Sequence, residues 1–319
     1  MSDETSGDPT RRAFLKGLAA LGTTTALAHR VSAQAASVRS SVAARTIPSS
    51  GEAIPAVGLG SWITFNVGND RVARAACADV MRVFFDTGGR LIDSSPMYGS
   101  AQGVIGEGLG RIGRAAPVFA ADKVWISSGA RGPEQIEQSR RLWNLPRFDL
   151  LQVHNLLGWE SHLHTLFAMK ATGRLRYVGI TTSEGRRHRE IEAIMRSQPI
   201  DFVQVTYNLL DREVEERILP LAQERGIAVI ANRPFREGAL LRALERHRLP
   251  AWAVELGCDG WAQFALKFIV SHPAVTCAIP ATSSVAHVRQ NMAAASGSLP
   301  DASMRQLSLI HISEPTRPY

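Results

Sequence analysis

Short apolar runs alternate with amphipathic stretches along the chain from about residue 56 onward. Several of these runs are apolar throughout, as expected of parallel strands that are covered on both faces. The run at 90–95 begins like a buried strand and then turns polar. We predict strands at 56–60, 90–95, 118–125, 149–155, 177–183, 202–208, 227–234 and 275–281.

The segments between these runs have the apolar spacing of helices that cover a sheet. Glycines that commonly end helices stand where the next strand should begin, at Gly173, Gly226 and the pair Gly88 and Gly89. Eight such repeats in about 260 residues predict a single (β/α)₈ barrel, the TIM-barrel fold. The clearest predicted helices cover 71–89, 132–145, 159–173, 186–198 and 212–226.

A doubly wound sheet is the alternative fold, and one short motif bears on it. The sequence "GLGRIG" at Gly108 to Gly113 has the spacing of a dinucleotide fingerprint. Such a fingerprint must follow a strand and open a helix. This one ends a helical pattern and precedes a strand, and no glycine-rich turn follows the first strand. We therefore favour the barrel.

Composition points to an ordinary globular protein with a sizeable core. The chain has 319 residues, of which 45% are hydrophobic and 20% charged, and its formal net charge is +7. The basic residues are scattered among acids, whereas a nucleic-acid-binding surface concentrates them. No apolar run has the length of a membrane span. We expect neither nucleic-acid binding nor stable membrane insertion.

No metal site is predicted. The three cysteines, Cys77, Cys258 and Cys277, have neither metal-ligand spacing nor the pattern of a disulfide framework. His162 and His164 stand two positions apart, and on a helix such residues face different directions.

The first 35 residues resemble a signal peptide that is removed on export. Arg11 and Arg12 precede Phe14-Leu15-Lys16, a mildly apolar stretch follows, and Ala33-Gln34-Ala35 provides small residues for cleavage. The arginine pair is typical of the twin-arginine route, which carries folded proteins. The sequence thus predicts a passing interaction with the twin-arginine translocase, a periplasmic or otherwise exported protein, and a linker at 36–46. The alternative for this segment is an amphipathic surface helix.

The last residues break the pattern of the barrel. Pro300 and Asp301 are typical of a helix start, but the helical spacing stops after Gln306. The segment "LSLIHISEPTR" is identical to the translation of a transposase sequencing adaptor. We therefore interpret 307–319 as an artefact and the barrel domain as 47–306. A genuine C-terminal extension is the alternative.

Four ionisable side chains of four types fall at predicted strand ends. Asp93 ends the second strand and Tyr98 follows in its loop, Lys123 lies near the end of the third strand, and His154 ends the fourth. Catalytic groups of a barrel gather at the carboxyl ends of its strands. A single polar residue at a strand end is more often a cap of a helix or turn, or a buried group that is hydrogen-bonded within the core. Four such residues on consecutive strands predict a catalytic site.

The chemistry of these groups suits a proton donor. A tyrosine has a pKa near 10, and a neighbouring ammonium lowers that pKa. A fall of two or three units requires about 3–4 kcal/mol, which a buried Lys123 can provide if Asp93 balances its charge. His154 is then free to orient a carbonyl oxygen. The matching electrophile is a carbonyl carbon that takes hydride from a nicotinamide.

The segments "IPAVGLGSW", "RLIDSSPMYGS", "ADKVW", "DLLQVHN", "YVGITTS", "QVTYN" and "IPATSS...VRQNM" resemble the aldo/keto reductase family, in order, from about residue 47 to 300. The resemblance implies a (β/α)₈ barrel that reduces an aldehyde or ketone with NAD(P)H. It places the family's catalytic tetrad on Asp93, Tyr98, Lys123 and His154, with Tyr98 as proton donor. An exported module that binds nicotinamide with little turnover is the alternative function, and a barrel that has lost the cofactor is a further one.

The resemblance also implies the cofactor contacts. Gln204 matches the glutamine that holds the carboxamide. Ala281 and His287 stand where many members have the Lys and Arg that bind the 2′-phosphate, so NADP(H) is expected from the family and NAD(H) is not excluded. The implied contacts are Thr181, Thr182, Gln204, Asn232, Arg233, Pro234, Phe235, Pro280, Ala281, Thr282, Ser283, His287, Arg289 and Asn291.

Two further expectations concern the surroundings of the tetrad. Trp62, Trp125 and Trp159 are candidates for the wall of a pocket for a small carbonyl substrate, because aromatic walls suit apolar ligands. Asp122 replaces the usual Thr or Ser before Lys123, and we expect this extra carboxylate to weaken the effect of the lysine on Tyr98.

Overall fold

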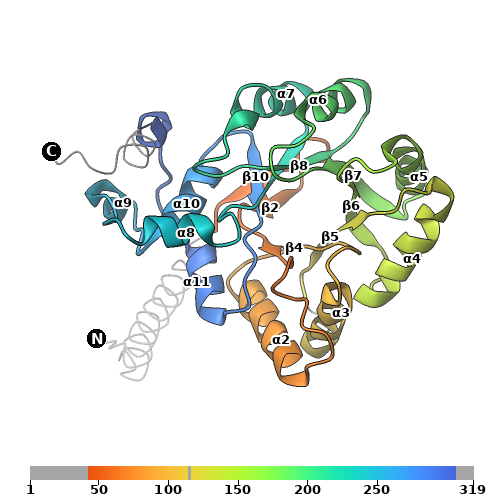
Figure 1. The fold of residues 1–319 in the computed structure, drawn as a ribbon, viewed down its shortest axis with the longest axis horizontal. Coiled ribbons are helices and arrows are strands. Elements are labelled where there is room, and N and C mark those ends of the chain that lie inside the picture. Colours follow the sequence, from red (N-terminus) through yellow and green to blue (C-terminus); the bar gives the residue numbers. More distant parts are fainter. Residues whose placement is uncertain (1–41, 114–115, 307–319) are drawn as a thin grey trace, which may run out of the picture. The chain divides into compact units, whose positions relative to one another are not determined.

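Eight parallel strands form a central sheet with helices around it (Figure 1). The computed structural model describes residues 42–113 and 116–306, all within a unit that begins at Val42. Strands neighbour one another in chain order from β3 to β10. They are β3 (Leu59–Gly60), β4 (Leu91–Asp93), β5 (Phe119–Val124), β6 (Phe148–His154), β7 (Leu175–Thr181), β8 (Phe202–Thr206), β9 (Ala228–Asn232) and β10 (Val275–Ala278).

Hydrogen bonds between the first and last strands close the sheet. The backbone N–H of Gly58 donates to the carbonyl of Ala278 at 2.8 Å, and the N–H of Gly60 donates to the carbonyl of Pro280 at 3.0 Å. Parallel bridges join Val57 to Ala278 and Gly60 to Ala281. The predicted (β/α)₈ barrel is therefore confirmed, and the doubly wound alternative is wrong.

A helix follows each strand of the barrel. Two short helices, α8 and α9, come between β9 and its covering helix α10, and they lie to one side of the barrel (Figure 1). The helices are α2 (Arg71–Asp86), α3 (Ala101–Ile112), α4 (Gly132–Trp143), α5 (Trp159–Ala171), α6 (His188–Ser197), α7 (Ile218–Arg225), α8 (Ala239–Leu244), α9 (Ala251–Glu255), α10 (Trp261–Val270) and α11 (Val285–Ala293), with 3₁₀ turns η1 (Gly129–Arg131) and η2 (Glu213–Glu215).

Local signals in the sequence account for several helix ends. The Asp70 side chain accepts hydrogen bonds from the backbone N–H groups of Val72 and Ala73 and so starts α2. Gly226 ends α7 in the left-handed conformation with φ 65°. The "GLGRIG" motif lies at the end of α3, where Gly113 has φ 88°, so its interpretation as a helix end is confirmed.

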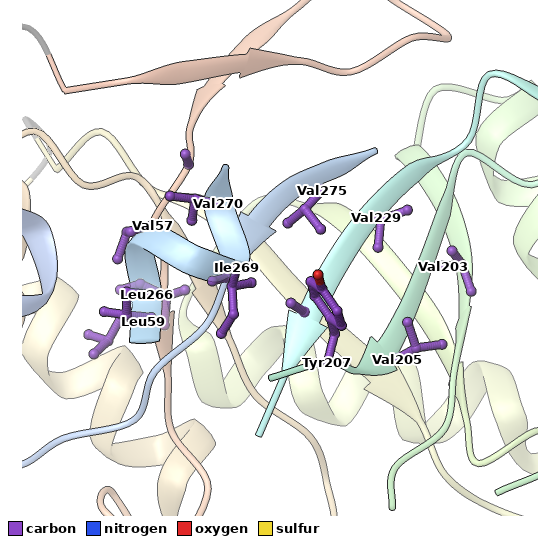
Figure 2. Packing of buried hydrophobic residues seen from close by; sticks show 14 of the residues in the cluster. Val57, Leu59, Val203, Val205, Tyr207, Val229, Leu266, Ile269, Val270 and Val275 are labelled. Carbon is purple, nitrogen blue, oxygen red and sulfur yellow. The ribbon is translucent and has the colours of Figure 1, made fainter. Parts of the chain in front are cut away.

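Apolar side chains pack in two shells because strand residues alternate between the two faces of the sheet. Val203, Val205 and Val229 face the helices, and Figure 2 shows Leu266 and Ile269 of α10 in the same outer cluster. The alternate residues fill the barrel interior. This inner cluster contains Leu91, Phe119, Ala121, Leu150, Tyr177, Phe202, Ala228, Ile230, Cys277 and Ile279.

A hairpin that the sequence did not predict closes the amino end of the barrel. β1 (Ala44–Thr46) pairs antiparallel with β2 (Ala53–Pro55). Its side chains Ile47 and Ile54 are fully buried within the inner cluster. The predicted boundary between linker and barrel at residue 47 is therefore wrong, because Ala44–Thr46 already belong to the folded domain. The predicted signal peptide at 1–35, residues 36–41 of the linker and the tail at 307–319 lie outside the described residues.

A short helical turn at 302–306 is attached to the outside of the barrel. The Asp301 carboxylate accepts from the backbone N–H of Met304 at 2.9 Å, so the predicted helix start is confirmed. The guanidinium of Arg305 donates to the Phe268 carbonyl and to the Tyr207 hydroxyl, and its carbon lies 4.3 Å from the Phe268 ring centroid. These contacts anchor the turn to α10 and to the end of β8.

A glycine allows α3 and α4 to cross at close range. A Cβ atom at Gly106 would lie 1.9 Å from the carbonyl oxygen of Leu142 near the end of α4. Backbone atoms cannot move aside as a flexible side chain can, so any larger residue must separate the two helices.

We expect Gly106→Ala to lower the free energy of unfolding by about 1–3 kcal/mol, the usual cost of overpacking. Gly110→Ala is the matched control on the same helix, because a Cβ there meets nothing within 4 Å. The control should be neutral or stabilising by up to about 1 kcal/mol, since alanine favours helix. Urea unfolding of both variants measures the difference, and equal stabilities would contradict the proposed close crossing.

Candidate active site

The alternation of strand residues carries polar side chains to the carboxyl end of the barrel interior. Asp93 comes two residues after Leu91 on β4, and Lys123 comes four after Phe119 on β5. His154 comes four after Leu150 on β6. Each polar residue therefore points inward above an apolar one, at the edge where barrel enzymes have their sites.

Lys123 and Asp93 form a buried ion pair. The Nζ atom donates to Oδ2 of Asp93 at 2.5 Å and to the Ser94 carbonyl at 2.8 Å, and the two side chains are 1% and 3% exposed. Burial acts to lower the pKa of Lys123, but the Asp93 carboxylate, followed by Tyr98, more than offsets it, so the pKa is raised. Lys123 is a permanent cation at neutral pH.

Tyr98 lies in the loop between β4 and α3, with its ring beside this cation. Nζ of Lys123 is 5.1 Å from the ring centroid, and the Trp62 ring lies 4.9 Å from it on the cavity side. Burial raises the pKa of Tyr98, and the charge of Lys123 offsets that effect only in part. The lowered pKa predicted from the sequence is wrong here, because the sequence does not report how strongly the phenol is desolvated.

His154 ends β6 and reaches the same cavity. Its Nδ1 lies 2.9 Å from the hydroxyl oxygen of Ser95, and its ring centroid is 5.9 Å from that of Tyr98. Burial, followed by the charge of Lys123, lowers the pKa of His154 to about 3. The imidazole is therefore neutral across the physiological range and able to donate one N–H.

Asp122 points away from this group, as alternation along β5 requires. Its carboxylate accepts from the backbone N–H of Lys123 and from the Gln102 amide of α3, each at 2.8 Å. The Gln102 amide also donates to the Ser139 hydroxyl of α4. Burial raises the pKa of Asp122 to about 7. Asp122 is thus held on the helix side of the strand and makes no hydrogen bond to the ammonium group of Lys123, but its charge helps to raise the pKa of Tyr98, which is the direction expected from the sequence.

A cavity of about 850 Å³ opens above the tetrad, within the range of sites for organic ligands. Asp93, Tyr98 and His154 line it, and Lys123 lies beneath. Three predicted cofactor contacts, Thr182, Pro280 and Arg289, are not among the described lining residues. The predicted contacts that line it are Thr181, Gln204, Asn232, Arg233, Pro234, Phe235, Ala281, Thr282, Ser283, His287 and Asn291.

Gln204 fits the expected carboxamide of a nicotinamide. Both its amide nitrogen and its amide oxygen are buried, and neither makes a hydrogen bond of normal length to the described residues, although the side chain lines the cavity and lies close enough to Asp93 to act on the pKa of that carboxyl. Buried amides are normally paired, so these two atoms indicate a ligand that offers one donor and one acceptor. The carboxamide of a nicotinamide offers both, through its NH₂ group and its carbonyl oxygen.

The side chains of Asn232 and Tyr207 are both held by hydrogen bonds within the protein. The Asn232 amide donates to the Thr182 carbonyl at 2.9 Å and accepts from the Thr206 hydroxyl at 2.8 Å, so it joins three neighbouring strands. Tyr207 is fully buried in the outer cluster, and its hydroxyl donates to the Glu215 carboxylate.

The cavity is poor in free positive charge. Arg233 is the one arginine or lysine among its described lining residues, and it pairs with Glu237 at 2.7 Å and with Glu184 at 3.4 Å. The described lining residues therefore include no unpaired lysine or arginine that could bind the 2′-phosphate of NADP(H). A dinucleotide fits these residues, and the choice between NADP(H) and NAD(H) stays a prediction.

The three tryptophans predicted to line the pocket have different positions in the structure. Trp62 lines the cavity next to Tyr98. Trp125 is 39% exposed, with its ring 6.4 Å from that of His154, and stands outside the described lining. Trp159 packs at the start of α5 against the outer cluster and, like Trp125, is not among the described lining residues.

Two groups of site residues were not predicted from the sequence. Ser95 is the last residue of the strand predicted at 90–95 and was not among the predicted site residues, although its hydroxyl touches His154. The segment from Glu237 to Gln263, which includes α8 and α9, also contributes to the lining through residues such as Leu241 and Trp261. It interrupts the strand–helix repeat, and no motif marks it.

Comparison with known proteins agrees with this geometry. The model of the aldo/keto reductase family matches residues 56–311, which extends into the segment after Gln306. Methylglyoxal reductase YeaE of Escherichia coli is 29% identical over 261 residues, covering 80% of this chain and 90% of that protein. The NADH-specific methylglyoxal reductase of the same organism is 24% identical over 230 residues, covering 62% and 68%.

Solved structures share the fold. An aldo/keto reductase from Klebsiella pneumoniae in complex with NADP and acetate has a TM-score of 0.70 at 24% identity, covering 86% of this chain and 97% of that one. The holo form of AKR11C1 from Bacillus halodurans also has a TM-score of 0.70, at 22% identity, covering 84% and 95%. With its barrel, its convergent tetrad and a family match over most of its length, this chain belongs to the aldo/keto reductase family.

Proposed function

We propose that this cavity reduces the carbonyl group of a small aldehyde or ketone, with Tyr98 as the proton donor. The observation that carries the proposal is the convergence of a buried cation, a phenol and a neutral imidazole on one cavity. A bound reduced nicotinamide supplies the hydride for such a reaction. The residues of the chain then have to bind the carbonyl oxygen and protonate it.

Tyr98 suits proton donation because its phenol is protonated at neutral pH. Lys123 lies 5.1 Å from the ring, so its charge stabilises the phenolate that remains after the proton has left. Asp93 and the Ser94 carbonyl hold the ammonium group in place. The neutral His154 helps to orient the carbonyl oxygen through a hydrogen bond.

The substrate is proposed to be a small 2-oxoaldehyde or a similar reactive carbonyl compound. Two curated relatives are named methylglyoxal reductases, and one of them is named NADH-specific. Trp62 and the exposed Ile63 and Met97 supply an apolar rim, which also suits larger aldehydes. Methylglyoxal is therefore the first compound to test, followed by aliphatic and aromatic aldehydes.

Tyr98→Phe should leave binding of NADH and NADPH near the wild-type level and slow carbonyl reduction by about 10²–10⁴, the usual contribution of general acid catalysis. Fluorescence titration measures binding, and consumption of reduced cofactor with each aldehyde measures turnover. Full activity of the variant would contradict the role of Tyr98.

Tyr177→Phe is the matched control for this change. Tyr177 lies at the amino end of the barrel, where its hydroxyl contacts Ser50 and Glu52, so the same atom is lost far from the cavity. We expect this control to keep its activity. A wild-type protein that binds the cofactor but turns over no carbonyl compound would favour a binding module instead of an enzyme.

Reduction should depend little on pH until the solution becomes strongly alkaline. The protonated phenol is the active form, and burial raises its pKa above the ordinary value of 10.0, so kcat/KM should stay level through neutral pH and fall only above that value. Alcohol oxidation, which needs the phenolate as base, should rise over the same range. A pH profile in both directions measures this.

A break near pH 7 in the reductive direction has two possible sources that a variant separates. Asp122 has a pKa of about 7, so a break that disappears in Asp122→Asn belongs to Asp122. A break that persists in Asp122→Asn would mean that Lys123 lowers the pKa of Tyr98 after all, which contradicts the effect of burial.

We also propose that residues 1–35 direct export through the twin-arginine route to the periplasm. The support is the sequence itself, with Arg11 and Arg12 ahead of a mildly apolar stretch and a small-residue cleavage site. Among the described residues, no helix has the length and apolar character to cross a membrane.

Changing Arg11 and Arg12 to lysine should leave uncleaved precursor in the cytoplasm, because the paired arginines are what the translocase recognises. Fractionation followed by immunoblotting measures the distribution of precursor and mature protein. A single Lys16→Arg change, which leaves the pair intact, serves as the control. An unchanged periplasmic fraction in the double variant would refute this route.

A further inference from the structure

Ser95 is a fully buried residue that contacts the imidazole of the site. It follows β4 by two positions and is 0% exposed. Its hydroxyl oxygen lies 2.9 Å from Nδ1 of His154 and accepts a hydrogen bond from the backbone N–H of Met97 at 3.1 Å. These are the polar contacts of this hydroxyl in the described chain.

Counting donors and acceptors fixes the direction of the bond to His154. A serine hydroxyl has one proton to donate and two lone pairs. The N–H of Met97 already uses one lone pair. If Nδ1 carried the ring proton and donated to Ser95, the buried hydroxyl proton would have no acceptor among the described residues. If the hydroxyl donates to Nδ1, every buried group is satisfied, which is the usual state of such groups.

We propose that Ser95 is a positioning residue that holds His154 in the tautomer with the proton on Nε2. The ring lines the cavity, and the hydrogen bond that it makes within the described chain is through Nδ1, so Nε2 is the nitrogen left for a substrate. This tautomer directs an N–H donor toward the carbonyl oxygen of the substrate. The inference rests on the proposed carbonyl reduction, because it assigns a role within that same site.

The choice of tautomer has a large effect because His154 is neutral. A protonated imidazole has a donor on both nitrogens, but burial and Lys123 keep this ring uncharged at physiological pH. In the other tautomer a lone pair on Nε2 would face the oxygen of the carbonyl group and repel it. A single buried hydroxyl thus decides whether the ring attracts or repels the substrate.

The test combines Ser95→Ala with a direct measurement of the tautomer. In protein labelled with ¹⁵N-histidine, long-range ¹H–¹⁵N correlation spectra at neutral pH show which ring nitrogen carries the proton, and His154→Gln identifies the signals. Wild type should show protonated Nε2, whereas Ser95→Ala should show a mixture of tautomers. In the variant kcat/KM should fall by about 2- to 10-fold, the effect of one neutral hydrogen bond, with unchanged binding of NADH and NADPH.

Ser139→Ala is the matched control. Ser139 is 1% exposed on α4, and its hydroxyl accepts a hydrogen bond from Gln102 on the helix side of the barrel. This variant loses the same atom from a buried site, so it should keep both the His154 signals and the turnover of the wild type.

Two results would overturn the proposal. One is a wild-type His154 with its proton on Nδ1, and this measurement holds even if Ser95→Ala does not fold. The other is a Ser95→Ala protein that keeps a single Nε2–H tautomer and full kcat/KM. Absence of turnover in the wild type would instead count against the proposed function, and the tautomer spectra would still decide the role of Ser95.

Discussion

The ion pair between Lys123 and Asp93 is the constraint on which the rest of the site depends. A charged amine that is 1% exposed must have a partner, because removing one member of a buried pair typically costs about 3–5 kcal/mol. The partner comes from the neighbouring strand, so β4 and β5 must keep their register, in which Asp93 pairs with Ala121. Once this cation is fixed, it shapes the pKa values of both Tyr98 and His154. The same charge therefore supports a phenol that gives up a proton and an imidazole that stays neutral.

The barrel interior changes character along its axis, and this gradient follows from the two-residue period of the strands. At the amino end, large apolar side chains such as Phe119, Tyr177 and Phe202 contact one another. Toward the carboxyl end, the same inward-facing rows continue into Lys123 and Gln204. The apolar layer provides the packing that holds the strands, and the polar layer above it provides the chemistry. The polar layer costs stability, which the tightly packed layer beneath it offsets.

The sequence predicted the eight strands and the tetrad well, because both depend on short-range patterns. In a barrel, a strand that becomes polar at its carboxyl end indicates a site, and this pattern can be read without knowing the helices. Asp93 and His154 could therefore be predicted as site residues from the sequence. The hairpin at residues 44–55 was not predicted, because two strands of three residues are too short to show a periodic pattern. The direction of the Tyr98 pKa shift and the role of Ser95 depend on burial and on contacts across 59 residues of chain, which no local pattern contains. Trp159 carries no such signal either, since a tryptophan at a helix start packs against a core as readily as it lines a pocket.

The hairpin of β1 and β2 has a consequence for the order of events during turnover. Ile47 and Ile54 fill the amino end of the barrel, so the cavity opens at the carboxyl end, where the tetrad lies. Two reactants must then pass through one entrance, and the one that reaches deeper has to arrive first and leave last. Gln204 lies inside the barrel, and the exposed rim of Trp62 and Met97 lies at the mouth. Gln204 lies deeper than this rim, so a dinucleotide whose carboxamide binds there would have to enter before the carbonyl compound and leave after the alcohol.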